Sequence, residues 1–262
     1  MTNQVARVAA LYDIHGNLPA LEAALADAEA TGVESFVLGG DLALGPMPRE
    51  TIDRLVALGS RASYLRGNCD RLMVDAFDGR SLASLPPAVQ ESITWAAGQL
   101  EQHQRDFLAG LPETLTLNID GLGPVLFCHA TPRSDDEIVT ARTPNECLAP
   151  ILAQVTQAVV VCGHTHMQFH RRLGKLHLVN AGSVGMPYGS AGAHWLLLGP
   201  HIELTRTAYD GARAAERIGE TSYPGAAEFA ARYVLHPPSE EEMLTLFEAA
   251  SPSQPPSGDS AT

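Results

Sequence analysis

The chain has 262 residues, of which 45% are hydrophobic, and its mean hydropathy is −0.01. This is the composition of an ordinary globular protein, with enough residues for one large domain or two small ones. The 17 basic and 30 acidic residues give a formal net charge of −13. Because such a chain repels nucleic-acid backbones, we expect no bulk binding to DNA or RNA.

The spacing of the cysteines favours a reducing compartment, and the short apolar runs argue against a secreted or membrane-spanning protein. The cysteines are Cys69, Cys128, Cys147 and Cys162, and their spacing contains no C-x-x-C zinc or redox pattern. We therefore expect reduced thiols rather than disulfides. The apolar run at residues 5–12 lacks the long apolar region of a signal peptide, and no stretch is long enough to span a bilayer. A cytoplasmic protein without a membrane partner is predicted.

In the first two thirds of the chain, apolar runs of strand length alternate with segments of helical period. The sequence predicts strands over residues 5–12, 35–41 and 62–70 and from residue 159, helices over 18–30, 48–58, 88–108 and 145–155, and a hairpin of 115–119 with 125–129. Pro19 lies in the first turn of the first helix, where proline is favoured. Alternating strands and helices are typical of parallel strands covered by helices.

From residue 173 the pattern changes to strands without intervening helices. Strands are predicted over residues 173–179, 193–198 and 202–209, and helices over 211–220, 226–235 and 239–250. We therefore predict an α/β fold of two sheets packed face to face with helices outside, built as a single domain over residues 1–250 with helices 211–250 packed on it. Residues 251–262 contain no large apolar side chain and are predicted to form a disordered tail.

The valine run at residues 159–161 is followed by His164 and His166, separated by one residue. Alternate side chains of an extended segment point the same way, so both imidazoles leave the strand end on one side. Gly163 lets the backbone approach a bound group. Imidazole is the commonest metal ligand in proteins. The pair therefore indicates a metal site, the alternative being two polar residues that cap a core strand.

Polar groups that bind metals follow the ends of five predicted strands. They are Asp13 and His15, Asp41, Asn68, His129, and His164 with His166. Strand carboxyl ends face the crevice in which an open α/β sheet binds ligands, so these groups can converge. Gly-Asp and Gly-Asn alone are more often turns or helix caps. Their joint occurrence, each after an apolar strand, predicts one site.

Seven side chains that mix carboxylate, amide and imidazole suit two divalent ions. Mn²⁺ is our first expectation, with Fe²⁺, Zn²⁺, Ni²⁺ or Co²⁺ as alternatives, because Ca²⁺ prefers shells made of oxygen alone. Two ions about 3.5–4 Å apart can polarise a phosphoryl group and generate a hydroxide between them. Hydrolysis of phosphate esters is the chemistry that such a pair favours.

The set Asp13-x-His15, Gly40-Asp41, Gly67-Asn68-Cys69-Asp70, His129 and Gly163-His164-x-His166 resembles the five-block signature of calcineurin-like metallophosphoesterases, over about residues 6–210. The resemblance implies a four-layer α-β-β-α sandwich of two mixed sheets flanked by helices. It also implies that Asp13, His15 and His166 hold one metal, that Asn68, His129 and His164 hold the other, and that Asp41 bridges them as a catalytic residue. The implied nucleophile is a metal-bound hydroxide.

Cys69 departs from the pattern of most members, which carry a histidine there that donates a proton to the leaving oxygen. The Gly-Asn-Cys-Asp version resembles a branch of small bacterial phosphodiesterases. The general acid stays open between a metal-bound water and another histidine, with His170 and His194 as candidates. Leaving groups that need little protonation, such as aryl alcohols, are expected to react best.

Three residues are candidates for contact with substrate, namely Arg66, Cys69 and Asn17. Arg66 resembles a phosphate-binding arginine of the phosphatase branches, and its alternative is a surface ion pair. Asn17 either contacts substrate or caps the helix that follows it. The segment from Asn180 to Pro187 resembles a loop that shapes the rim of the pocket in this branch.

The resulting hypothesis is a metal-dependent hydrolase of small phosphodiesters or nucleotide-like substrates. One alternative is a phosphomonoesterase, including a protein serine/threonine phosphatase. The alternative from another class is a non-catalytic scaffold that binds proteins, although such scaffolds tend to lose ligands that this chain retains. The helices after residue 211 either pack on the core or form a homodimer surface.

Overall fold

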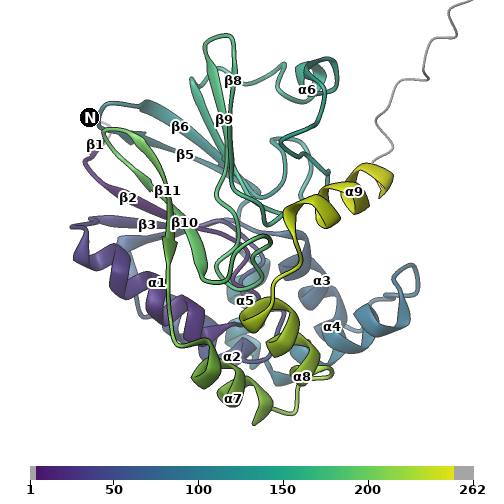
Figure 1. Ribbon diagram of the computed structural model, residues 1–262. Coiled ribbons are helices and arrows are strands. Elements are labelled where there is room, and N and C mark those ends of the chain that lie inside the picture. Colours follow the sequence, from purple (N-terminus) through teal and green to yellow (C-terminus); the bar gives the residue numbers. More distant parts are fainter. Residues whose placement is uncertain (1–3, 251–262) are drawn as a thin grey trace, which may run out of the picture.

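Residues 4–250 are described by the computed structural model of the chain. The tail predicted over residues 251–262 lies outside the described residues. The strands form two mixed sheets that stack face to face, and helices cover their outer faces (Figure 1). The predicted α-β-β-α architecture is confirmed.

One sheet combines the early parallel strands with the late antiparallel ones, in the order β11-β10-β2-β3-β4. Its strands are β2 (Val8–Leu11), β3 (Ser35–Leu38), β4 (Ala62–Tyr64), β10 (Ala193–Leu198) and β11 (Ile202–Thr207). β2, β3 and β4 run parallel, and β10 pairs antiparallel with β2 and with β11. The parallel strands therefore end at one edge of this sheet.

The other sheet has the order β1-β5-β6-β7-β9-β8. Its strands are β1 (Gln4–Val5), β5 (Thr114–Ile119), β6 (Gly123–Cys128), β7 (Val159–Cys162), β8 (Phe169–Leu173) and β9 (Leu176–Asn180). β5 and β6 form the predicted hairpin, and β6, β7 and β9 run parallel. β6 and β7 therefore also end at a common edge.

The helices flank the two sheets. They are α1 (Leu18–Ala30), α2 (Pro48–Val56), the 3-10 helix η1 (Gly59–Arg61), α3 (Asn68–Phe77), α4 (Pro87–Gln99), α5 (Gln102–Ala109), α6 (Asn145–Ile151), α7 (Gly211–Gly219), α8 (Ala226–Phe229), the π-helix η2 (Ala230–Leu235) and α9 (Glu240–Ala250). Figure 1 shows α1, α2 and α7 outside the five-stranded sheet and α6 beside β8 and β9. No helix among residues 4–250 is long and apolar enough to cross a membrane.

Apolar runs without alternation are explained by strands that are buried on both faces. In β7, Val159 and Val161 lie in the core between the two sheets, whereas Val160 and Cys162 pack outward with Leu148 of α6. The same alternation holds for β2, whose outward residues join the helices of the first sheet. Three cores therefore separate the four layers.

Two predicted strands have different boundaries. The strand predicted over residues 5–12 is divided, because β1 pairs with β5 of one sheet and β2 with β3 and β10 of the other. The strand predicted over residues 62–70 ends at Tyr64, and α3 begins at Asn68. Asp70 accepts a hydrogen bond from the Gly67 N–H at 2.9 Å and so caps this helix, which the sequence prediction lacked.

Two further predictions are corrected by local turns. The strand predicted over residues 173–179 is present as β9, which begins later, at Leu176. Gly174 has a φ of +64° and turns the chain between β9 and β8, a strand that was not predicted. The single helix predicted over residues 88–108 is divided after Gln99. Leu100 is extended there, and the Glu101 N–H donates to Gln104 Oε1 at 3.0 Å to start α5.

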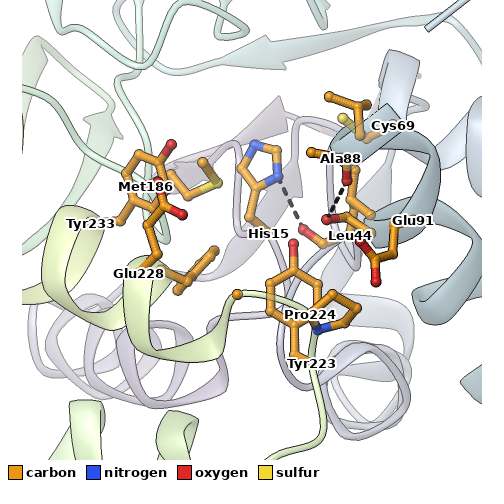
Figure 2. Close-up of a pocket in the computed structure, with 14 residues that line it drawn as sticks. His15, Leu44, Cys69, Ala88, Glu91, Met186, Tyr223, Pro224, Glu228 and Tyr233 are labelled. Atoms are coloured by element: carbon orange, nitrogen blue, oxygen red, sulfur yellow. Dashed lines mark hydrogen bonds between the residues drawn. The ribbon is translucent and has the colours of Figure 1, made fainter. Parts of the chain in front are cut away.

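The C-terminal helices pack against the first sheet and its helices. Ile218 of α7 and Phe229 of α8 belong to the same core as α1, and Met243 of α9 contacts Met167 and Tyr188. The segment between α7 and η2 also forms one wall of a cavity of about 730 Å³ (Figure 2). This cavity lies beside the ends of the parallel strands.

Candidate metal centre

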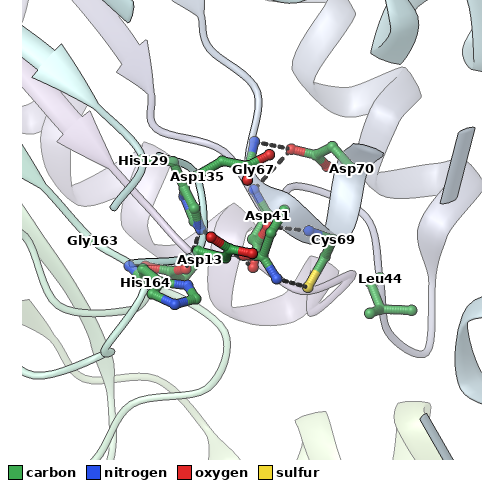
Figure 3. Close-up of polar contacts among 12 residues, drawn as sticks. Asp13, Asp41, Leu44, Gly67, Cys69, Asp70, His129, Asp135, Gly163 and His164 are labelled. Carbon is green, nitrogen blue, oxygen red and sulfur yellow. Dashed lines mark hydrogen bonds and ion pairs between the residues drawn. The ribbon is translucent and has the colours of Figure 1, made fainter. Parts of the chain in front are cut away.

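The structure brings together all seven side chains predicted to bind metal. Asp13 and His15 follow β2, Asp41 follows β3, Asn68 begins α3, His129 follows β6, and His164 and His166 follow β7. Figure 3 shows that Asp13, Asp41, His129 and His164 point toward a common centre from these different elements. The parallel strands of both sheets therefore deliver their polar ends to one place.

The ligand atoms form three groups, and within each group they lie within 4.8 Å of one another. Asp13 groups with His15 and His166, and Asp41 groups with His129 and His164. A third group, His15 with Asp41 and Cys69, shares one residue with each of the other two. Asp41 Oδ2 is 3.7 Å from His15 Nε2 and 3.5 Å from His129 Nε2, so Asp41 lies between the groups. Asn68 Oδ1 lies 3.2 Å from His129 Nε2. The grouping is the one that the resemblance implied, and the assignment of its members to two metal ions stays a prediction.

Backbone carbonyls orient the imidazoles. The Nδ1 atoms of His129, His166 and His15 lie 2.8, 2.8 and 3.3 Å from the carbonyl oxygens of Gly39, Met186 and Leu44. A carbonyl can only accept, so each Nδ1 carries a hydrogen and donates it. Nε2 of each neutral ring then presents its lone pair to the centre, as second-shell hydrogen bonds do in metal sites.

Backbone amides orient the two carboxylates in the same manner. The His164 N–H donates to Asp13 Oδ2 at 2.9 Å, and the Cys69 N–H donates to Asp41 Oδ1 at 2.8 Å. The second oxygen of each carboxylate is therefore left to face the centre. Asp13 Oδ1 is buried and has no hydrogen-bond partner, an arrangement that is unfavourable without a cation.

The residues present fit a pair of divalent transition-metal ions. His15 Nε2 and His166 Nε2 lie only 3.1 Å apart. Two ring nitrogens at that distance need a proton or a metal ion between them. The donors are imidazole nitrogens and carboxylate or amide oxygens, which suit Mn²⁺, Fe²⁺ or Zn²⁺. The unsatisfied Asp13 Oδ1 and the facing nitrogens thus indicate where positive charge is needed.

Five of the candidate ligands have backbone dihedrals in the left-handed region. Asp13, His15, Asp41, His164 and His166 have φ angles of 53°, 49°, 52°, 67° and 58°. Residues other than glycine rarely adopt this region, and strained residues of this kind gather at functional sites. Hydrogen bonds between the loops hold the turns, among them the one from the His15 N–H to the Asp41 carbonyl at 2.9 Å.

Burial and the charges of neighbouring groups shift the pKa values of the candidate ligands. Burial, followed by the nearby His166, lowers the pKa of His15 to about 4. Burial opposes protonation of His129 too, but the carboxylates of Asp41 and Asp13 raise the pKa of His129 to about 10. Although burial opposes it, the nearby histidines keep the pKa of Asp13 and of Asp41 below their usual values. The carboxylates are therefore ionised, ready to bind cations.

Asp70 has a positioning role that the sequence interpretation missed. Its buried carboxylate accepts hydrogen bonds from the N–H groups of Asp41, Leu42 and Gly67 at 2.8, 2.9 and 2.9 Å. Figure 3 shows how it ties the loop after β3 to the start of α3. The signal was present, because an acid at the third position of a helix is a capping residue, but the helix itself was not predicted.

The segment from Asn180 to Pro187 supports the ligand loops from behind. Asn180 Nδ2 donates to the Gly163 carbonyl at 2.6 Å, and Ser183 Oγ donates to the Asp13 carbonyl at 2.7 Å. The Met186 carbonyl accepts from His166, and the Met186 side chain lines the cavity. The segment therefore reaches the pocket rim and also fixes two ligand turns.

The predicted substrate contacts have different surroundings. Asn17 is fully buried and caps α1, because its Oδ1 accepts the Ala20 N–H at 3.2 Å while its Nδ2 donates to the Gly185 carbonyl at 2.9 Å. Arg66 Nη2 donates to Glu113 Oε1 at 2.6 Å and faces a second cavity of about 310 Å³. The alternative interpretations, a helix cap and an ion pair, describe the contacts of these two residues.

Cys69 lines the 730 Å³ cavity together with His15. Burial and the adjacent Asp41 raise the pKa of the Cys69 thiol well above its usual value, so the thiol is neutral. The two histidines considered as proton donors have other partners. His170 Nε2 lies 2.7 Å from His177 Nδ1 on the β8–β9 hairpin, and His194 Nε2 lies 3.0 Å from the Ser190 carbonyl.

A stacked pair of mixed sheets whose strand ends gather carboxylates and imidazoles around one centre defines the class of α/β metallohydrolases. The chain belongs to the calcineurin-like phosphoesterase superfamily, since the sequence model of that domain matches residues 7–199. It is therefore a hydrolase of phosphate esters that uses divalent metal ions, as the resemblance of its motifs implied.

Similar proteins support the same placement. The chain is 27% identical to the uncharacterized protein MJ0912 of Methanocaldococcus jannaschii over 240 residues, which are 83% of this chain and 93% of the relative. A metallophosphoesterase from Sphaerobacter thermophilus has 25% identity and a TM-score of 0.69, covering 88% of this chain and 100% of its own. Hypothetical protein PH1004 from Pyrococcus horikoshii shares the fold, with a TM-score of 0.75 at 21% identity over 89% of this chain and 99% of its own.

Proposed function

We propose that the protein is a Mn²⁺-dependent phosphodiesterase that acts on small diesters or nucleotide-like substrates. Asp13, His15 and His166 would hold one ion, and Asn68, His129 and His164 the other, with Asp41 between them. The observation that carries the proposal is the buried Asp13 Oδ1, which accepts no hydrogen bond, beside two imidazole nitrogens 3.1 Å apart. Bound divalent ions supply Lewis-acid charge to the phosphoryl oxygens.

The residues of the chain prepare this site before substrate arrives. The amides of His164 and Cys69 fix the two carboxylates, and the carbonyls of Gly39, Met186 and Leu44 fix the three imidazoles. Such preorganisation removes the need to reorder polar groups during the reaction.

The surroundings of the centre favour a diester. The cavity beside it is lined by no lysine or arginine among the described residues, whereas the second negative charge of a monoester calls for such a cation. The position of the usual acid histidine holds the neutral thiol of Cys69. Esters with leaving groups of low basicity are therefore expected to react fastest. Contact of substrate with Arg66 or Asn17 stays a prediction.

The test compares hydrolysis of bis-p-nitrophenyl phosphate and p-nitrophenyl phosphate by metal-stripped protein with and without added Mn²⁺. Mn²⁺-dependent preference for the diester supports the proposal. Asp41→Asn should abolish activity and lower the metal content, and Asp120→Asn, in the β5–β6 turn, is the matched control. Preference for the monoester would point to the phosphatase alternative. Silence on both esters with metal bound would favour the scaffold alternative.

Two further predictions from the sequence enter the proposal unchanged. A reducing, cytoplasmic location is proposed from the spacing of the cysteines in the sequence. Homodimer formation is a separate prediction, which the mass of the protein in solution decides.

A further inference from the structure

The cavity beside the metal centre has two unlike walls. One is formed by the C-terminal segment, with Tyr223, Phe229 and Tyr233, and the other by α4 with Glu91. In Figure 2, Glu228 and Tyr233 lie on one side of His15, and Glu91 and Cys69 lie on the other. The volume of about 730 Å³ is that of a pocket for an organic ligand. A phosphate at the centre would therefore extend one substituent into this space.

The charge of the lining selects against anions. Glu91 and Glu228 are exposed at the cavity, and among the described residues neither forms an ion pair. No lysine or arginine from the described part of the chain lines the same space. Carboxylates only accept hydrogen bonds, so the wall is suited to hydroxyl or amino donors and repels further phosphates.

The aromatic wall is continuous with the metal centre. Ring contacts run from His166 to Tyr188 at 5.3 Å, from Tyr188 to Tyr233 at 6.5 Å, from Tyr233 to Phe229 at 5.3 Å and from Phe229 to Tyr223 at 6.0 Å. Aromatic pairs at these separations stabilise one another. Tyr223, Phe229 and Tyr233 line the cavity, and aromatic side chains are surfaces on which a flat aromatic base can stack.

We propose that this cavity binds a neutral nucleoside carried as one substituent of a phosphodiester, and that it rejects substituents with additional phosphates. The base would lie on the aromatic wall made by Tyr223 and Tyr233, and the sugar hydroxyls would donate to Glu91 or Glu228, as ribose hydroxyls do to carboxylates in nucleotide sites. The inference rests on the proposed function for the position of the phosphate.

Matched chromogenic esters test this selection. The p-nitrophenyl ester of thymidine 5′-monophosphate and methyl p-nitrophenyl phosphate have the same leaving group and differ only in the second substituent. With Mn²⁺, kcat/KM for the thymidine ester should be at least about tenfold higher, mainly through a lower KM. Thymidine 3′-phosphate 5′-(p-nitrophenyl phosphate) keeps the leaving group and adds one phosphate, and its kcat/KM should be at least about tenfold lower than that of the thymidine ester, because the carboxylates of the cavity repel the added charge.

Variants test whether the residues of the cavity cause the preference for the thymidine ester. The double variant Glu91→Gln/Glu228→Gln, which alters exposed side chains, and Tyr223→Leu should each reduce the preference for the thymidine ester at least about fivefold. Glu216→Gln on α7 removes one exposed carboxylate away from the cavity and should keep the preference. A second readout needs no metal: isothermal titration of the metal-free protein with thymidine should show binding that both cavity variants weaken and Glu216→Gln does not.

The outcomes separate this inference from the proposed function. Hydrolysis of the methyl ester without preference for the thymidine ester, and without thymidine binding, would overturn the inference and leave the phosphodiesterase intact. Binding of thymidine that depends on the cavity residues, with no hydrolysis of any ester, would support the inference and overturn the proposed function. Preference for p-nitrophenyl phosphorylcholine over the thymidine ester would assign the cavity to cationic substituents and overturn it too.

Discussion

Each buried carboxylate at the centre has one oxygen held by a backbone amide and one left for the centre. Asp13 and Asp41 reach this arrangement through His164 and Cys69, which are themselves parts of the site. The amide of Asp41 is in turn held by Asp70 at 2.8 Å. The orientation of the candidate ligands therefore depends on residues that never face the substrate.

Asp70→Asn is expected to weaken Mn²⁺ binding by about 10–100-fold, the usual effect of losing an outer-shell partner. The substitution would replace one of the two acceptor oxygens of Asp70 with an NH₂ group, which is a donor. Either the N–H of Leu42, or the N–H groups of Asp41 and Gly67, would then face a donor in place of an acceptor. Competition with a metal-sensitive dye measures the affinity. Asp120→Asn controls for the loss of a carboxylate. Unchanged Mn²⁺ affinity in Asp70→Asn would show that Asp70 does not position the metal ligands.

Metal affinity should rise with pH between about pH 6 and 8. The raised pKa of His129, about 10, means that the metal-free centre holds a proton there, which an incoming ion must displace. A falling proton concentration therefore favours the ion, by about tenfold per pH unit for each displaced proton. Calorimetric titration in buffers of different ionisation enthalpy counts the released protons. Affinity that is constant over this range would contradict the assignment of His129.

At the scale of the elements, tight turns after the strands bring the loops that carry the candidate ligands close together. The left-handed residues reverse the chain directly after β2, β3 and β7, and neighbouring loops then approach closely. A Cβ on Gly67 would lie 2.1 Å from Asp41 Oδ1 and 2.4 Å from Asp41 N. Glycine is therefore required at the point where the loop after β3 meets the start of α3.

Two Gly→Ala substitutions should have opposite effects. Gly67→Ala should lower the free energy of unfolding by about 1–3 kcal/mol, because backbone must move to admit the methyl group, and should impair Mn²⁺ binding. Gly98 lies in α4, and nothing is within 4 Å of a Cβ added to it. Gly98→Ala should therefore raise the free energy of unfolding by about 0.5–1 kcal/mol. Urea denaturation measures both, and equal effects would contradict this argument.

Elements with a clear period could be predicted from the sequence, and those set by tertiary contacts could not. α1 and β10 have the predicted boundaries. The division between β1 and β2 depends on which sheet each half pairs with, and no local pattern records that choice. α3 was missed because its first residues were interpreted as the end of a strand, although Asp70 carried the capping signal.

At the scale of the whole molecule, the two sheets and the metal centre are expected to stabilise each other. The centre joins loops from both sheets, since Asp41 follows β3 and His129 follows β6. An ion that binds only the folded chain adds its binding energy to folding. It also relieves the crowding of the facing nitrogens of His15 and His166.

Removal of metal should lower the melting temperature. Mn²⁺ at 100 times its Kd is expected to add about 2.7 kcal/mol, which corresponds to roughly 5–10 °C for a chain of this size. Differential scanning calorimetry with Mn²⁺ and with a chelator measures the shift. Asp41→Asn should show a much smaller shift, and equal shifts in both proteins would place the stabilising ion elsewhere.

The position of the seven candidate ligands around one centre could be predicted, because their residue types and their places at the ends of successive strands are visible in the sequence. The cavity could not, because its wall comes from Tyr223, Phe229 and Tyr233, which lie far along the chain in a segment without a motif. The role of Asn180 was hidden for another reason, since it acts through a backbone carbonyl that a sequence does not display. The capping signal of Asp70 was visible, but its hydrogen bonds to the amides of Asp41 and Leu42 depend on the tertiary structure.

The order of the chain gives the aromatic wall a consequence during synthesis. All seven candidate ligands are present once residue 166 has left the ribosome, whereas the wall ends at Tyr233. The nascent protein therefore carries its candidate ligands and the wall formed by α4 before it carries the aromatic wall. The proposed contacts of the base therefore lie in a stretch of the chain separate from the candidate ligands, so that evolution can alter the aromatic wall through the C-terminal segment while it leaves the ligands untouched.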